Sequence, residues 1–185
     1  MIYAQLHLTL PPWVHAAIDV DRAYADADAQ VALAIELSRL NVEHASGGPF
    51  GAAVFTEAGR LVGVGVNRVV AHNCSAAHAE VMALSTSQQR LQRFRLNVDG
   101  GRFRLATSAQ PCAMCYGALI WAGIDELLVG ARADDVQELA GFDEGPLPAD
   151  WRGELERRGI AVQADLRRDE ACAVLRAYGE SGVVY

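Results

Sequence analysis

Residues 111–122 read PCAMCYGALIWA, in which a proline precedes two cysteines three positions apart and then a run of apolar side chains. Proline suits the start of a helix, because its missing N–H would have no hydrogen-bond partner there. The stretch therefore predicts a helix from Cys112 to Ala122 with Cys112 and Cys115 in its first turn. Residues three apart share a helix face, and the positive end of the helix dipole favours thiolates.

A second helix start lies upstream at His78-Ala79-Glu80. A catalytic zinc ion takes three protein ligands and keeps its fourth position for water, whereas a structural zinc ion fills all four positions with cysteine or histidine. His78, Cys112 and Cys115 supply three ligands if the two helix N-termini converge. Glu80 lies two residues beyond His78, where a carboxylate can act as general base and then as general acid without being a ligand.

Strands and helices alternate along the chain on either side of these motifs. The turn Glu57-Ala58-Gly59-Arg60 joins two apolar runs and predicts an antiparallel hairpin. A hairpin followed by alternating elements indicates an α/β sandwich, with helices on both faces of a mixed sheet. We expect strands at 52–56, 61–66, 103–107, 126–131 and 160–164, helices at 29–43, 77–94, 112–122 and 169–178, and a loop-rich segment at 134–150.

Composition limits the classes of function. The 185 residues, 51% of them apolar, suffice for one sizeable core, so we expect a single domain. The formal charge of -7 disfavours a nucleic-acid substrate, because each phosphate contact needs lysine or arginine. No run approaches the ~18 apolar residues of a membrane span, and residues 1–10 lack a basic leader. We expect a cytoplasmic protein, since a C-x-x-C pair in a reducing compartment favours metal chemistry over a disulfide.

The combination His-x-Glu and Pro-Cys-x-x-Cys is the signature of zinc-dependent nucleobase deaminases. From residue 47 to residue 131 the chain resembles the cytidine/deoxycytidylate deaminase superfamily. Three strings resemble its guanine deaminase branch: Gly47-Gly48-Pro49-Phe50, Asn67-Arg68-Val69 and Phe142-Asp143-Glu144-Gly145-Pro146. The resemblance implies a three-layer α/β/α sandwich with a mixed five-stranded sheet and one Zn²⁺ per chain. It also implies one deaminase domain over residues 1–185, in which residues 132–185 complete the substrate pocket.

The guanine deaminase resemblance also implies roles for individual residues. Glu144 would be a second catalytic carboxylate beside Glu80, because guanine presents adjacent N1–H and 2-amino donors that a carboxylate can accept. Asn67 would hydrogen-bond the purine, and Phe50 would pack against its ring. Similar enzymes are homodimers whose C-terminal segment often closes over the pocket of a domain-swapped partner. The implied substrate contacts are Asn67, Phe50, Ala79 and Tyr185, the last as a lid residue.

Some features leave alternatives to this site open. The family usually has glutamate directly before Pro-Cys, whereas this chain has Gln110, whose amide keeps one acceptor but removes a charge. Cys74 precedes His78 by four positions and could complete a closed structural zinc site. A C-x-x-C pair can also be a redox dithiol, although redox chemistry would not need His-x-Glu. Cys172 lies in an apolar helix and is expected to be a core residue.

The substrate also has alternatives. Ammeline, guanosine, cytosine or cytidine could be deaminated at the same zinc centre. A transfer-RNA adenosine deaminase has an almost identical metal motif, but its substrate demands a positive surface that this acidic chain lacks. A zinc-stabilised protein that binds a nucleobase without turnover is the non-enzymatic alternative. Taken without the resemblance, Asn67 would be interpreted as a turn residue and Asp143-Glu144 as solvated loop charge.

Overall fold

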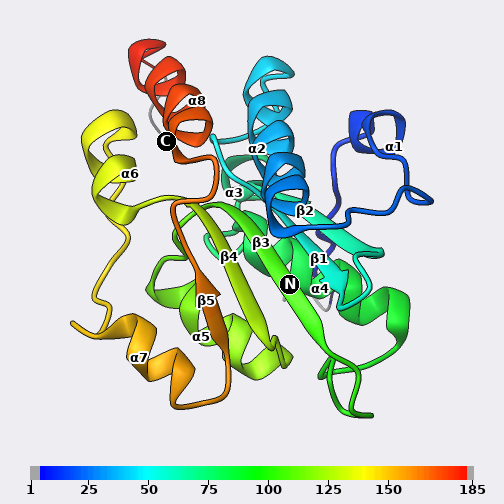
Figure 1. Cartoon of the computed structure of the whole chain (residues 1–185). Coiled ribbons are helices and arrows are strands. Elements are labelled where there is room, and N and C mark those ends of the chain that lie inside the picture. The colour runs from blue at the N-terminus through cyan, green and yellow to red at the C-terminus, as the bar shows by residue number, and fades with distance from the viewer. Residues whose placement is uncertain (1–4, 183–185) are drawn as a thin grey trace.

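The computed structural model describes residues 5–182, which form a five-stranded mixed sheet with helices on both faces (Figure 1). The strand order is β2-β1-β3-β4-β5. The first strand pairs antiparallel with both of its neighbours, and the last three strands run parallel. The strands are β1 (Gly51–Thr56), β2 (Leu61–Val66), β3 (Phe103–Ala109), β4 (Glu126–Ala131) and β5 (Ala161–Gln163).

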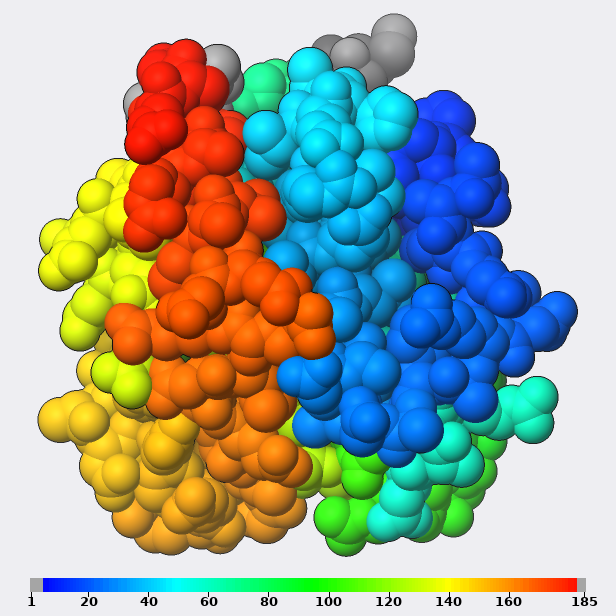
Figure 2. Space-filling model, turned by 45° about the horizontal axis from the view of Figure 1, so that its top comes forward, coloured from blue at the N-terminus to red at the C-terminus, as the bar shows by residue number. Residues whose placement is uncertain are grey.

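Six helices make the two outer layers of the sandwich. One face of the sheet carries α2 (Ala27–Glu43), α6 (Ala133–Ala140) and α8 (Arg168–Glu180), and the other carries α4 (Ala79–Leu91), α5 (Ala113–Ala122) and α7 (Trp151–Glu156). The short helices α1 (Trp13–Ala17) and α3 (Val69–His72) complete the described elements. Figure 2 shows α8 lying between α6 and α2 on the surface. The predicted three-layer α/β/α sandwich is confirmed. No helix among residues 5–182 is long and apolar enough to cross a lipid bilayer.

The strand β1 is buried on both faces. Ala53 and Phe55 belong to the core beneath α2, whereas Ala52 and Val54 belong to the core beneath α4. This division follows from the two-residue period of a strand, which turns successive side chains to opposite faces. A central strand covered on both sides needs apolar residues throughout, so GAAVFT shows no alternation of polar and apolar residues.

Gly65 lets α4 approach the sheet closely. A Cβ atom at this position would lie 2.0 Å from the carbonyl oxygen of Ala79 and 2.3 Å from the backbone nitrogen of Ala83. Any side chain there would displace the helix backbone, so the missing Cβ allows the first turn of α4 to lie directly against β2. His78 and Glu80 flank Ala79 in the chain, and this contact therefore sets their distance from the sheet.

Several boundaries differ from the sequence-based expectations. The helix expected over 77–94 is the shorter α4, and Cys112 is the N-cap of α5 rather than its first helical residue. The expectation of a loop-rich segment over 134–150 is wrong at its start, where α6 forms. This helix buries Val136 and Ala140 and is capped at its C-terminus by Gly141, which adopts a φ of 76°. The glycines and prolines that follow α6 obscured its amphipathic pattern.

Asp135 joins α6 to α8. Its carboxylate accepts a hydrogen bond from the backbone N–H of Arg132 at 2.8 Å and two from the guanidinium of Arg168 at 2.6 and 2.7 Å. The Arg168 hydrogen bonds, together with the backbone bond from Arg132, lower the pKa of Asp135 from 3.8 to about 2. The carboxylate is buried, so it stabilises the packing of these helices more than an exposed ion pair would.

We expect Asp135→Asn to lower the free energy of unfolding by about 1–2 kcal/mol near neutral pH. A depressed folded-state pKa gives stability that is present above the unfolded pKa of 3.8 and is lost as the pH falls through about 2. Denaturant titrations of wild type and variant should therefore converge across this interval. Asp134→Asn removes the same charge from an exposed position and serves as the control. A difference that stays constant down to the lowest pH would contradict this assignment.

Candidate active site and metal centre

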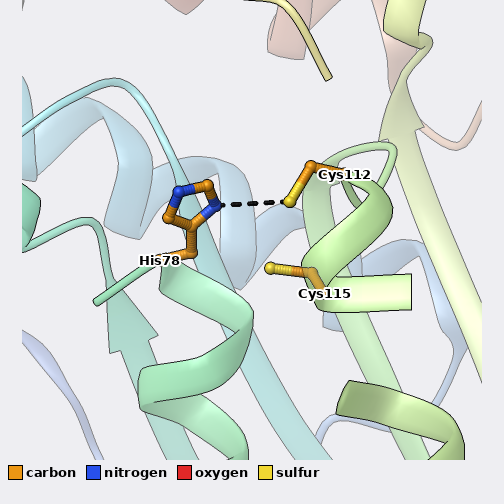
Figure 3. Close-up of side chains that lie close together, drawn as sticks. All are labelled: His78, Cys112 and Cys115. Carbon is orange, nitrogen blue, oxygen red and sulfur yellow. Dashed lines mark hydrogen bonds between the residues drawn. The ribbon is translucent and has the colours of Figure 1, made fainter. Parts of the chain in front are cut away.

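Three potential metal ligands meet where two helices begin. His78 is the N-cap of α4, Cys112 is the N-cap of α5, and Cys115 lies in the first turn of α5. Their ligand atoms all lie within 4.8 Å of one another, and Cys112 Sγ is 3.5 Å from His78 Nδ1 (Figure 3). The predicted convergence of the two helix N-termini is confirmed.

The donor set fits zinc. One imidazole nitrogen and two sulfur atoms are ligands that zinc prefers. Zn–S and Zn–N bonds of about 2.3 and 2.0–2.1 Å at a tetrahedral angle would place sulfur and nitrogen about 3.5 Å apart. The Cys112 to His78 distance has this value. Cys74 does not belong to the ligand group within the described part of the chain, so three ligands leave a fourth position for water.

The electrostatics of the ligand cluster favour a thiolate at Cys112. A hydrogen bond from Cys115, with a further one from His78, lowers the pKa of Cys112 to about 4, while burial opposes this shift. The hydrogen bond to Cys112, with burial, raises the pKa of Cys115. The hydrogen bond to Cys112 also raises the pKa of His78. A thiolate among buried groups at two positive helix ends is suited to bind a cation.

A cavity of about 150 Å³ opens beside these ligands at one edge of the sheet. Gly51 pairs with Val66 and Ala52 with Thr107, so the start of β1 and the ends of β2 and β3 meet at this edge. Ligands of open α/β sheets commonly bind beyond the carboxyl ends of strands. The cavity is lined by Phe50, Asn67, His78, Glu80, Gln110, Phe142, Asp143 and Glu144.

Two carboxyl groups in the cavity are suited to proton transfer. Glu80 is 8% exposed, and burial, followed by the charge of Cys112, raises its pKa to about 7. Burial, followed by the charges of Glu80 and Cys112, raises the pKa of Glu144 to about 8. Acidic groups with pKa values near neutrality can both accept and release a proton under ordinary conditions.

The loop that carries Glu144 is attached at several points. The backbone N–H of Ala113, at the start of α5, donates to the carbonyl oxygen of Glu144 at 2.9 Å. The ring of Phe142 packs edge-on against Phe50, with centroids 5.2 Å apart, and stacks on Tyr178 of α8 at 5.9 Å. These contacts hold an otherwise irregular segment against α5, α8 and the residue before β1.

Most of the residues expected at the site lie together. Asn67, Phe50 and Glu144 line the cavity with Glu80 and the ligand histidine. Ala79 is buried in the first turn of α4 but does not line the cavity among the described residues, so its substrate contact stays a prediction. Tyr185 lies outside the described residues.

Sequence reasoning did not place three of the side chains that line this cavity in the site, namely Gln110, Phe142 and Asp143. The ring of Phe142 lines the cavity because it stacks on Tyr178 of α8, a contact that no local sequence pattern reveals. Gln110 also lines the cavity, and its Oε1 accepts a long hydrogen bond of 3.4 Å from the N–H of Ala133. Gln110, which stands where the family usually has glutamate before Pro-Cys, therefore faces the cavity.

The sandwich and its three-ligand centre define a zinc-dependent hydrolase with a buried carboxyl group beside the metal position. Residues 25–131 match the family model of the cytidine and deoxycytidylate deaminase zinc-binding region. The chain belongs to this family and is a hydrolytic deaminase.

Solved structures similar to this chain include purine-binding proteins. The structure of the guanine deaminase from Nitrosomonas europaea has a TM-score of 0.91 and 47% sequence identity, covering 97% of this chain and 99% of that one. A mutant protein in complex with 8-azaguanine has a TM-score of 0.90 and 48% identity, covering 96% and 98%. Complexes with 8-azaguanine include mutants in which asparagine is replaced by alanine or glutamine, or glutamate by aspartate.

Relatives found by sequence include two kinds of deaminase. The guanine deaminase of Bacillus subtilis (strain 168) is 36% identical over 111 residues, which cover 60% of this chain and 67% of the relative. A tRNA-specific adenosine deaminase from Buchnera aphidicola subsp. Schizaphis graminum (strain Sg) is 31% identical over 128 residues, covering 69% and 77%. Relatives of similar sequence identity are therefore named for different substrates.

We expect Cys115→Ala and His78→Ala to lose the zinc ion that the purified wild-type chain retains, because each leaves only two protein ligands. Elemental analysis after dialysis should fall from about one zinc per chain toward none. Cys74→Ala is the matched control and should keep its zinc. Loss of zinc from Cys74→Ala as well would indicate a closed, structural four-ligand site.

Proposed function

We propose that this chain hydrolyses guanine to xanthine and ammonia. The observation that carries the proposal is the convergence of Asn67, Phe50 and Glu144 on one cavity with Glu80 and the metal ligands. Each is a residue that the guanine deaminase resemblance assigns to the base or to its chemistry. Solved structures at 47–49% identity include a guanine deaminase and complexes with 8-azaguanine and 2,6-diaminopurine, which support a purine base as substrate.

The cavity walls suit a flat, donor-rich base. Phe50 and Phe142 form an aromatic wall on which a planar ring can pack. Glu144 and Asp143 supply carboxyl groups from the same loop. Guanine presents two donors on the carbon that is attacked, the ring N1–H and the 2-amino group that leaves. Asn67 is 1% exposed, so its amide has little freedom and can orient the base by hydrogen bonding.

In the proposed reaction, protons are transferred by the carboxyl groups of Glu80 and Glu144. When bound by His78, Cys112 and Cys115, zinc supplies a Lewis acid that makes water a nucleophile near neutral pH. Glu80 takes a proton from the attacking water and passes it to the ring nitrogen beside the attacked carbon. It then moves the remaining hydroxyl proton to the departing amino group, so that ammonia leaves and a carbonyl remains. Glu144 accepts hydrogen bonds from the donor edge of the base and assists the departure of ammonia.

The other candidate substrates are weaker fits. Cytosine and cytidine have no ring N–H beside the carbon that bears the amino group, so they offer no such donor to Glu144. Ammeline and guanosine keep a guanine-like donor edge and remain as alternatives. An RNA substrate is disfavoured by the net charge of -7 and by the acidic side chains in the cavity. Simple binding of a nucleobase would give no role to Glu80 or to the open fourth metal position.

The remaining assignments concern the whole chain. We propose that residues 1–185 form one deaminase domain whose core is residues 47–131, since the loop from residue 141 to residue 145 supplies part of the cavity wall. We also propose a cytoplasmic location and a role in purine breakdown. All four cysteines are unpaired, and ligand thiols need a reducing compartment.

We propose a homodimer, since two large aromatic side chains are exposed next to each other. Trp121 is 79% exposed and Phe94 is 83% exposed, and both line a groove between α4 and α5. Exposed apolar patches of this kind mark protein interfaces. Exchange of the C-terminal segments between protomers, with Tyr185 as a lid, stays a prediction.

Ammonia release should be fastest with guanine in a panel that also contains guanosine, ammeline, cytosine, cytidine and adenine. We expect Glu80→Gln and Glu144→Gln each to lower kcat at least about 100-fold, because each removes a proton-transferring group. Both variants should keep zinc and their thermal stability. Preference for a pyrimidine would contradict the roles of Asn67 and Glu144, and full activity of Glu80→Gln would contradict the mechanism.

The oligomeric state can be measured by light scattering on a sizing column. We expect wild type to elute as a dimer and Trp121→Glu as a monomer, because a charge in the apolar groove would have to be desolvated on association. Val20→Glu changes another exposed apolar residue, 53% exposed and away from this groove, and should stay dimeric. A dimeric Trp121→Glu variant would place the interface elsewhere.

A further inference from the structure

Asn41 lies in the last turn of α2 and is completely buried, although it takes no part in the metal centre. We propose that Asn41 is a positioning residue that sets where Asn67 and Phe50 meet the substrate. This inference rests on the proposed function, because it assumes that these two residues bind the base. Asn41 does not line the cavity, so it acts only through the segments it holds.

The side chain of Asn41 ties two segments of backbone to the helix. Its Nδ2 donates to the carbonyl oxygen of Gly48 at 2.8 Å and to that of Asn67 at 3.0 Å. Its Oδ1 accepts a hydrogen bond from the hydroxyl of Ser46 at 2.7 Å. Both amide protons are therefore used, and each holds the carbonyl group of a buried residue.

The two carbonyl groups belong to the segments that present the base-binding side chains. Gly48 lies two residues before Phe50, and the other carbonyl is that of Asn67 itself. The backbone N–H of Asn67 also donates to the carbonyl oxygen of Phe50 at 3.1 Å. Asn41 thus joins both segments to α2 at a point where they are already joined to each other, which leaves them little freedom to move independently.

Close packing at Gly47 shows how tightly these segments are held. A Cβ atom on Gly47 would lie 1.9 Å from the carbonyl oxygen of Asn67 and 2.7 Å from Nδ2 of Asn41. Only glycine allows the loop to pass this close to the end of β2. The loop at Gly47 and Gly48 and the end of β2 at Asn67 are therefore held together by the side chain of Asn41.

Ser46 is held in turn by two other residues, Trp13 and Arg68. Trp13 donates from Nε1 to Ser46 Oγ at 3.0 Å, and its ring stacks on His44 with centroids 5.3 Å apart. The guanidinium of Arg68 donates to the carbonyl oxygen of Ser46. These contacts fix the position of the Ser46 hydroxyl. Because this hydroxyl donates to Oδ1 of Asn41, it determines which end of the amide is the acceptor.

The position of Asn41 predicts a particular kinetic signature. The metal ligands and Glu80 belong to α4 and α5, which lie on the opposite face of the sheet from α2 (Figure 1). Loss of the Asn41 hydrogen bonds should let the base-binding segments move while the proton-transfer groups stay in place. We expect KM for guanine to rise about tenfold, with kcat within about threefold of wild type.

The experiment compares Asn41→Ala with Gln30→Ala in the zinc-loaded protein. Gln30 is a second completely buried amide on α2, and it donates to the carbonyl oxygen of Tyr24 at 3.0 Å, away from the cavity. Both substitutions remove a buried side-chain amide from α2, so both should lower the melting temperature. Only Asn41→Ala should raise KM. Equal KM values for the two variants, or a fall in kcat alone, would overturn the proposal.

Two further variants keep the test decisive. Ser46→Ala removes only the hydroxyl that orients Asn41, so it should fold if Asn41→Ala does not, and should raise KM by a smaller factor. Asn67→Ala should raise KM at least as much as Asn41→Ala. An unchanged KM for Asn67→Ala would overturn the proposed base-binding site and this inference with it. A raised KM for Asn67→Ala, with unchanged values for Asn41→Ala and Ser46→Ala, would overturn this inference alone.

Discussion

The architecture depends on bringing three ligand atoms from two helix N-termini within 4.8 Å of one another. A helix start is the one place where a cysteine or histidine can be presented together with unpaired backbone N–H groups and the positive end of a dipole. Both helices must therefore begin at the same edge of the sheet and on the same face. Gly65 allows this for α4, because a side chain there would collide with the helix backbone. The buried Glu80 then lies beside the metal position as a consequence of the same helix start.

The site separates two tasks between different parts of the fold. The candidate metal ligands and Glu80 lie at the starts of α4 and α5 on one face of the sheet, whereas the proposed base-binding side chains lie in the loop before β1, at the end of β2 and in the loop after α6. The proposed base-binding segments have no regular secondary structure where they meet the cavity. They are held instead by side chains from the opposite layer, namely Asn41 of α2 and Tyr178 of α8. Such support from a neighbouring shell is what keeps a binding site rigid when it is built on loops.

Local patterns predicted the elements of the fold and the candidate metal ligands well, because both are encoded over short distances along the chain. The hairpin, the helix starts and the spacing of the cysteines each depend on neighbours within a few residues. The strands Leu61–Val66 and Glu126–Ala131 have the predicted boundaries. The helix α6 was missed since glycines and prolines follow it closely. Glu144 was assigned only through a family resemblance, because an acidic pair in a loop is usually solvated. Its burial against Glu80 and the metal ligands is what raises its pKa.

The amino-acid sequence by itself determined the class of chemistry, since a His-x-Glu and a Pro-Cys-x-x-Cys at helix starts leave few other uses for those residues. Only the tertiary structure decided which remaining side chains share the cavity. Phe50, Asn67, Gln110 and Glu144 come from four separate segments, and their meeting depends on strand order and on packing across the sheet. Asn41 shows the same limit most clearly. A buried amide in a helix has no local signature of function, because its role is set by the two distant carbonyl groups that it holds.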